Sequence, residues 1–201
     1  MILIFFHQLN RNISMSKIQK QSRRVRMLLQ SFLALTPIMV CYFWLTVQTP
    51  YDFLSEMGII QFSIEMDYFI TSPLTVSPLT TTTRIIAMFT SLAMSSILMY
   101  ALTVLIRLFR NYERGEIFSL ENAMSYQKLG YSLFYWVLGS VIYGSLMSVI
   151  LSFNNPPGDR IFEISFVGMD FLTLILGIII LIISWVMKEG YILADEHSQT
   201  I

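Results

Sequence analysis

The chain has 201 residues, of which 55% are hydrophobic and only 13% are charged. Because soluble globular domains carry about a quarter charged residues, this composition excludes an ordinary soluble domain and is typical of membrane proteins. Basic and acidic residues are equal in number, 13 of each, so the net charge indicates neither an acidic nor a basic partner. The single cysteine, Cys41, excludes an intramolecular disulfide and a cysteine-based metal cluster within one chain.

The N-terminal segment 1–7 is apolar but too short to span a membrane, and no basic residue precedes it. It therefore predicts neither a signal peptide nor a span. Met15 is an alternative start of translation, and the sequence leaves open whether residues 1–14 belong to the natural protein.

Four uncharged stretches approach or exceed the roughly 20 helical residues that cross a bilayer core. They predict spans at about 27–48, 85–106, 130–152 and 165–187. The fourth is the shortest, because its uncharged part, Phe171 to Met187, has 17 residues and must be extended backwards. We therefore predict an all-α fold, a four-helix transmembrane bundle that forms a single membrane domain over residues 1–201.

The basic residues are divided unequally between the two sides of these spans. Eleven lie before the first span, between the second and third, or after the fourth, whereas only Arg84 and Arg160 lie on the other side. With acidic residues counted, the two sides carry net charges of +5 and −5. Since basic residues concentrate in cytoplasmic loops, we predict a multi-pass protein of the cytoplasmic (inner) membrane with both termini inside.

The outer loop 49–84 contains one segment with strand periodicity. From Ile60 to Ile70, apolar residues mostly alternate with polar ones, which is the pattern of a half-buried strand. A lone strand leaves backbone groups unpaired, and the stretch Arg160–Ser165 in the second outer loop is a candidate partner. The two segments could form a small extracytoplasmic β-hairpin.

The inner loop has clear helix-end signals. The second helix is predicted to continue past the membrane and to end at Gly115, after Arg110 and Arg114 in its last turns. Ser119 is the expected N-cap of the next helix, and Glu121 lies in that helix's first turn. These signals predict a cytoplasmic helical hairpin over 107–129, with a cytoplasmic tail over 188–201.

The loop Leu108–Ser119 and the tail Met187–Glu196, followed by Thr200-Ile201, resemble a bacterial membrane-protein family of unknown function, the domain-of-unknown-function family DUF2975. Its members have a Gly-Glu-x-Phe-type inner loop and a Glu-Gly-x-x-Leu-x-x-Glu tail that ends in Thr-Ile. The similarity covers roughly the chain after Met15, although His197–Gln199 departs from the tail pattern. The resemblance implies a four-helix fold and its topology but no activity. Some relatives are encoded beside a small helix-turn-helix regulator, which implies a link to transcriptional control.

Two sets of candidate site residues follow. The candidate cytoplasmic motif consists of Arg110, Arg114, Gly115, Phe118, Glu189, Gly190, Leu193 and Glu196. The candidate helix-packing residues are small and recur at fourfold spacing, which lets helix backbones approach closely in lipid: Ser91, Ser95, Ser140, Gly144, Ser148, Thr173 and Gly177. We expect these to pack within one bundle in preference to forming a homodimer face.

Asp170 is the one carboxylate that could enter the bilayer. An intramembrane acid is a functional candidate by default. Because 17 uncharged residues follow it and cover ~25 Å as a helix, we expect Asp170 near the outer interface. There it would have a structural role, and it could reach water or pair with Arg160 or Arg84.

No phosphate-binding glycine loop, metalloprotease motif, nucleophile elbow or kinase signature is present, so we expect no enzyme, cofactor or metal site. The inner segments are too short for a DNA-binding domain, which leaves the lipid bilayer and a protein at the cytoplasmic face as expected partners. The leading hypothesis is a non-enzymatic signalling, regulatory or interaction protein. One alternative is a transporter subunit with a polar path along residues such as Ser95, Thr103 and Tyr143; another is an immunity-type protein.

Overall fold

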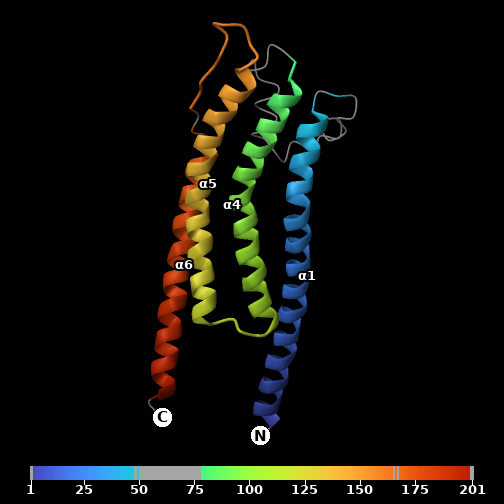
Figure 1. Cartoon of the computed structure of the whole chain (residues 1–201). Helices are drawn as coiled ribbons and strands as arrows, with labels where there is room; N and C mark the ends of the chain where they lie inside the picture. The colour runs from blue at the N-terminus through green and yellow to red at the C-terminus, as the bar shows by residue number, and fades with distance from the viewer. Residues whose placement is uncertain (1, 48, 50–77, 165, 167, 200–201) are drawn as a thin grey trace. The chain divides into compact units, whose positions relative to one another are not determined.

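The computed structural model describes residues 2–47, 49, 78–164, 166 and 168–199. Four long helices contain most of them: α1 (Ile2–Thr46), α4 (Thr81–Glu113), α5 (Leu120–Ser152) and α6 (Gly168–Gln199) (Figure 1). All four are long and apolar enough to cross a membrane, and no strand occurs among the residues just given. The predicted all-α, four-helix transmembrane fold is confirmed.

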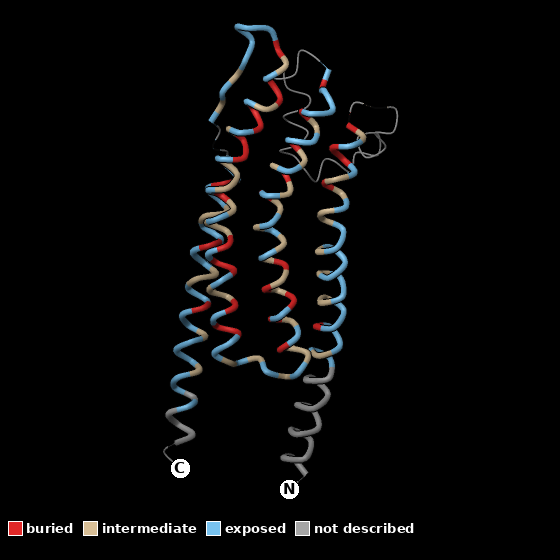
Figure 2. The backbone as a smooth tube through the Cα atoms, in the orientation of Figure 1, coloured by how far each residue is buried: buried red, intermediate tan, exposed pale blue. Residues whose placement is uncertain are grey.

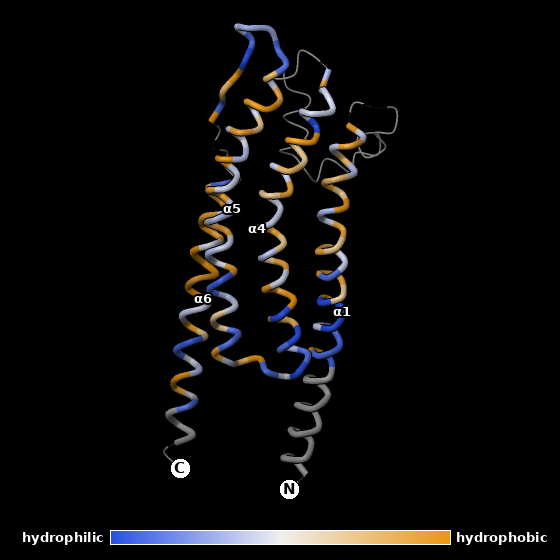
Figure 3. The backbone as a smooth tube through the Cα atoms, in the orientation of Figure 1, coloured by the Kyte–Doolittle hydropathy of each residue, from blue (hydrophilic) through white to orange (hydrophobic). Residues whose placement is uncertain are grey.

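The apolar side chains of these helices lie largely on the outside. Figure 3 shows hydrophobic residues along all four helices, and Figure 2 shows that many positions on the same helices are exposed. Phe32, Leu45, Phe89, Leu138 and Trp185 are each at least 60% exposed. In water, each Å² of apolar area left exposed would cost about 25 cal/mol of folding free energy. In lipid, such an apolar surface is the ordinary surface of a spanning helix. The chain is a multi-pass membrane protein.

The chain divides into two compact units, and each helix contributes to both. The first unit contains Met1–Ala34, Met99–Phe134 and Leu172–Ile201, and the second contains Leu35–Leu98 and Tyr135–Phe171.

The second unit has the larger apolar core, built around Trp44, Met147 and Leu151, each at most 1% exposed. Inside it, the Trp44 indole Nε1 donates a 2.8 Å hydrogen bond to Ser91 Oγ, which lies 3.0 Å from the Tyr143 hydroxyl. These bonds join α1, α4 and α5. They also satisfy polar groups that would be costly to leave unpaired in an apolar core.

The first unit contains a smaller core of Val104, Leu108 and Leu129. Here α6 approaches α5 at two glycines, since a Cβ atom built on Gly130 would lie 3.2 Å from the Gly177 carbonyl oxygen. Close backbone approach of this kind requires small residues. The sequence-predicted packing residue Gly177 therefore lies at an α5–α6 contact within the chain.

The segment after α5 turns back along that helix. Its described residues, 153–164 and 166, include no strand. The Ile161 amide donates to Ser152 Oγ and the Glu163 amide donates to Ser148 Oγ, both at 3.1 Å. The segment is thus held by serine hydroxyls of α5, so residues 160–164 do not form the expected strand; the other expected strand, 60–70, lies outside the described residues.

Candidate functional site

The loop between α4 and α5, residues 114–119, begins and ends as its sequence predicts. Gly115 has a φ of 83°, the left-handed region that favours glycine, and it is the second residue after the end of α4. Ser119 Oγ accepts a 3.2 Å hydrogen bond from the Asn122 amide, so it caps α5. The Glu116 amide donates to the Asn111 carbonyl at 3.0 Å, which folds the loop back onto α4.

A buried pair of asparagines holds this loop from within. Asn122 is fully buried, and its Nδ2 donates to the carbonyl oxygens of Glu116 and Ile117. Its Oδ1 accepts a 2.9 Å bond from Asn111 Nδ2. One side chain therefore ties the loop backbone to the ends of two helices. The sequence analysis did not identify either asparagine as important. A signal was available, because each amide side chain lies near a helix end and Asn122 is next to the apolar residue Ala123.

Helix α1 is joined to the same region by an ion pair. Arg26 Nε lies 2.8 Å from Glu113 Oε2, and Arg23 Nε lies 4.0 Å from Glu113 Oε1. The Arg26 and Glu113 side chains keep about a quarter of their surfaces exposed. Solvent screening limits a pair of this kind to roughly 0–1 kcal/mol. The contact positions α1 beside the end of α4. From the sequence, Arg23 and Arg26 were expected only to set the orientation of the chain in the membrane.

Most motif residues in or beside this loop are exposed, whereas Gly115 is half-buried. Phe118 is 80% exposed, and Arg110, Arg114 and Glu116 are also exposed. Because the backbone on both sides of Phe118 is fixed by hydrogen bonds, this aromatic ring is presented outward by the fold.

The tail residues of the motif lie on α6. Glu189, Gly190 and Leu193 are exposed, and nothing stands within 4 Å of a Cβ built on Gly190. The side chain of Glu196 lies outside the described residues. Helix α6 reaches the hairpin through Ser184, whose hydroxyl donates a 2.8 Å bond to the Ala123 carbonyl.

The small residues of α5 contact the segment that follows this helix and the start of α6, which their spacing alone did not predict. Ser140, Gly144 and Ser148 lie on one face, which continues to Ser152. This face receives the extended segment through Ser148 and Ser152, and the start of α6 through Ser140. The hydroxyls of Ser148 and Ser152 therefore bind non-helical backbone on this face.

The other small residues lie at interior positions on α4 and α6. Ser91 is buried in the hydrogen-bonded group with Trp44, and Ser95 Oγ donates to the Ser91 carbonyl at 2.7 Å. Thr173 is half-buried on α6.

Asp170 is buried against the middle of α5. It is 7% exposed, and Ser140 Oγ donates a 3.3 Å hydrogen bond to its Oδ1. Ser140 precedes Ser152 by 12 residues, a distance of ~18 Å along the helix. Asp170 therefore contacts α5 about 18 Å from the Ser152 end of that helix, and its expected position near the outer interface stays a prediction.

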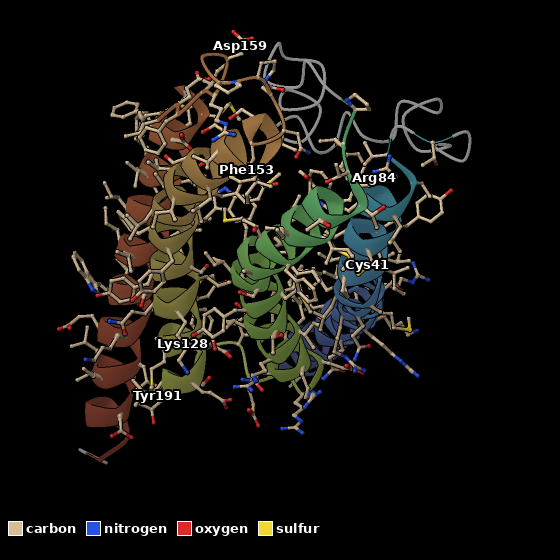
Figure 4. All side chains as sticks on the ribbon, turned by 45° about the horizontal axis from the view of Figure 1, so that its top comes forward. Cys41, Arg84, Lys128, Phe153, Asp159 and Tyr191 are labelled. Carbon is tan, nitrogen blue, oxygen red and sulfur yellow. The ribbon has the colours of Figure 1, made fainter. Side chains whose placement is uncertain are left out.

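Both arginines lie near the far end of α5 instead. The Arg160 guanidinium is 5.1 Å from the centre of the Phe153 ring, and both labelled side chains of the loop end, Phe153 and Asp159, are visible in Figure 4. Arg84 follows Thr83, whose Oγ1 accepts a 2.8 Å bond from Asn154 Nδ2.

Among the residues that the structure describes, no group of three or more His, Cys, Asp or Glu side chains could hold a metal ion. The arrangement around the loop 114–119 offers instead hydrogen-bonding, charged and aromatic groups at a surface.

Comparison with protein families gives one match. The family model described as "Protein of unknown function (DUF2975)" matches residues 19–201. Comparisons with curated proteins and with solved structures give no match. The matched range contains both motifs and all of α4, α5 and α6. The chain therefore belongs to the DUF2975 family, as its loop and tail motifs indicated.

Proposed function

We propose that this protein is a non-enzymatic interaction or regulatory protein of the cytoplasmic membrane, and that it acts through the loop 114–119 on the cytoplasmic side. The observation that carries the proposal is the exposed Phe118 on a loop held by the buried Asn122. A preformed surface loses little conformational entropy when it binds. Large side chains that become buried supply much of the energy of protein interfaces.

The distribution of charge supports the cytoplasmic placement of this loop. Its neighbourhood contains Arg107, Arg110, Arg114 and Lys128, and all four are exposed. Basic residues close to spans set orientation, so this side would face the cytoplasm.

Orientation can be tested by cysteine labelling in a Cys41→Ser background. With a membrane-impermeant maleimide, Asp159→Cys should be labelled in intact cells, and Phe118→Cys only after the cells are permeabilised. The reverse labelling pattern would overturn the proposed orientation.

The contact itself can be tested by replacing Phe118 with a photo-reactive phenylalanine analogue in growing cells. We expect light-dependent crosslinking to one dominant protein, and loss of that protein from pull-downs of the Phe118→Ala variant. Phe153→Ala is the matched control, because Phe153 is similarly exposed but lies at the other end of α5. If alanine substitutions through 107–119 and 189–196 left every bound protein unchanged, the proposal would fail.

The hydrogen bonds of two hydroxyl groups on the supposed transporter path favour an interaction protein over a transporter. Ser95 donates to the Ser91 carbonyl, and Thr103 donates to the Met99 carbonyl at 2.8 Å. Hydroxyls that bond within their own helix supply few groups to a permeating solute. A solute flux into proteoliposomes that required these hydroxyls would favour the transporter instead.

A further inference from the structure

Contacts within the first unit show which parts of its four helices lie at one level. Arg26 of α1 pairs with Glu113 at the end of α4, and the buried asparagine pair joins that end of α4 to the start of α5. Ser184 of α6 bonds to the Ala123 carbonyl near the same start of α5. Arg26, the end of α4, the start of α5 and the part of α6 just after Ser184 therefore share one level.

On α1 and α6, exposed apolar side chains continue as far as this level. Met27 and Leu28 directly follow the arginine that pairs with α4, and they are 48% and 60% exposed. On α6, Trp185 and Val186 are 62% and 66% exposed, and the first charge after them is Lys188. Tryptophan is also typical of the membrane–water interface. At α1 and α6 the hydrocarbon layer therefore extends to about this level.

Helices α4 and α5 carry exposed positive charges on the hydrocarbon side of the same level. Arg107 lies six residues before the end of α4 and Lys128 eight residues after the start of α5, which is ~9 Å and ~12 Å along the two helices. Arg110 lies between Arg107 and the helix end, and all three side chains are exposed. Among the described residues, the ion pairs join α1 to Glu113 and leave these three cations without a carboxylate partner.

Exposed tyrosines lie on the same two helices. Tyr100 is seven residues before Arg107 on α4 and is 48% exposed, and Tyr131 is three residues after Lys128 on α5 and is 47% exposed. Tyrosine gathers at membrane–water interfaces, with its ring in the apolar layer and its hydroxyl among the headgroups. The change from apolar to polar surface is therefore deeper on α4 and α5 than on α1 and α6.

Exposed cations at this depth require anions that the chain does not supply. A charged side chain that faces hydrocarbon carries a large free-energy cost, which local thinning of the bilayer reduces. The long stems of arginine and lysine lie along apolar surface while their charged heads reach the headgroup layer. Lipid phosphates supply negative charge in that layer, and basic sites between spanning helices bind the headgroups of anionic lipids.

We propose that Arg107, Arg110 and Lys128 bind the headgroup of an anionic phospholipid, which is drawn deeper along α4 and α5 than the lipids beside α1 and α6. Each guanidinium can donate two parallel hydrogen bonds to phosphate oxygens, and the lysine ammonium adds a point charge. With the orientation proposed above, this lipid belongs to the cytoplasmic leaflet. The inference goes beyond the proposed role of the loop 114–119, because it assigns a ligand to the neighbouring helix faces.

Native mass spectrometry of the detergent-solubilised full chain tests the binding, with phosphatidylglycerol as the anionic probe and phosphatidylcholine as the neutral comparison. Since each basic residue near the membrane surface contributes about fivefold to the affinity for anionic lipid, Lys128→Gln should weaken phosphatidylglycerol binding by about that factor. The triple substitution Arg107→Gln, Arg110→Gln and Lys128→Gln should weaken it by about a hundredfold. The matched control is Arg24→Gln on α1, an exposed cation outside the proposed site, which should change the affinity little.

Three outcomes of this measurement would overturn the proposal. They are equal binding of the two lipids, a loss in Arg24→Gln as large as that in Lys128→Gln, and displacement of the lipid by inorganic phosphate. The last outcome would indicate a site for free phosphate, whereas a lipid held also by its acyl chains should stay bound.

The depth of the headgroup can be tested with two cysteines at one level. Met124 follows Ala123 and Ile183 precedes Ser184, so the hydrogen bond between α5 and α6 places them together, and they are 49% and 41% exposed. In a Cys41→Ser background in phosphatidylglycerol vesicles, with a water-soluble maleimide on both sides, Met124→Cys should be labelled much faster than Ile183→Cys. Equal rates, whether fast or slow, would mean that the leaflet is not drawn inward at α5. No partner protein takes part in either measurement, so both results are independent of the proposed role of the loop 114–119.

Discussion

Replacing Asn122 of α5 with alanine should destabilise the helical hairpin more than truncating any side chain of the loop 114–119. The change removes three hydrogen bonds: two to the carbonyls of Glu116 and Ile117, and one from Asn111. At about 1 kcal/mol net for each bond, the free energy of unfolding should fall by about 3 kcal/mol. Asn111→Ala loses only the shared bond and should cost about 1 kcal/mol.

The measurement is unfolding of the detergent-solubilised protein by added SDS, followed by the circular dichroism of the helices. Hydrogen exchange of the loop amides would be measured in parallel, and it should become faster in Asn122→Ala. Because the two asparagines share one bond, the double variant should cost less than the sum of the single variants. The matched control is Met124→Ala, whose side chain is exposed on the same helix.

A cost below about 1 kcal/mol for Asn122→Ala, or unchanged exchange in residues 114–119, would refute this reasoning. Either result would mean that Asn122 does not hold the loop. The exposed Phe118 would then belong to a flexible loop, and the argument from a preformed surface would be lost.

Three further predictions concern packing. Gly130→Ala should destabilise the protein by about 1–3 kcal/mol, because the new Cβ would lie 2.7 Å from Leu181 side-chain atoms; unchanged SDS unfolding would contradict the close contact. Gly190→Ala should instead stabilise α6 by up to about 1 kcal/mol, since nothing lies within 4 Å of the added atom, and a loss of helicity would count against it. Trp44→Phe should cost about 1–3 kcal/mol by leaving its partner Ser91 without the indole donor; if Trp44→Phe unfolded at the same SDS concentration as the parent, the bond would be unimportant.

The local signals at the hairpin could be interpreted from the sequence because they depend on neighbouring residues. Gly115 ends α4 through its own backbone conformation, and Ser119 caps α5 through an amide three residues away. The uncharged stretches likewise predicted four membrane-crossing helices, since the length of a span follows from bilayer thickness. These features require no knowledge of distant contacts.

The asparagine pair could not be predicted in this way. Asn111 and Asn122 lie on different helices, and their bond depends on how the two helix ends meet. The same holds for Arg26 and Glu113, which are separated by 87 positions. A charge pattern gives the side of the membrane on which such residues lie, but not the partner of each one.

Asp170 separates most clearly what the sequence by itself determined from what only the tertiary structure decided. Composition and charge determined that the chain crosses the membrane in four apolar segments, because burying charge in lipid is costly irrespective of the fold. The depth of Asp170 depends on where α6 begins against α5, and counting uncharged residues assumed a helix up to the interface. The hydroxyls of Ser152 and Ser148 instead accept hydrogen bonds from the Ile161 and Glu163 amides, and Asp170, in the first turn of α6, contacts Ser140. Hydrogen bonds between distant parts of the chain decided that position.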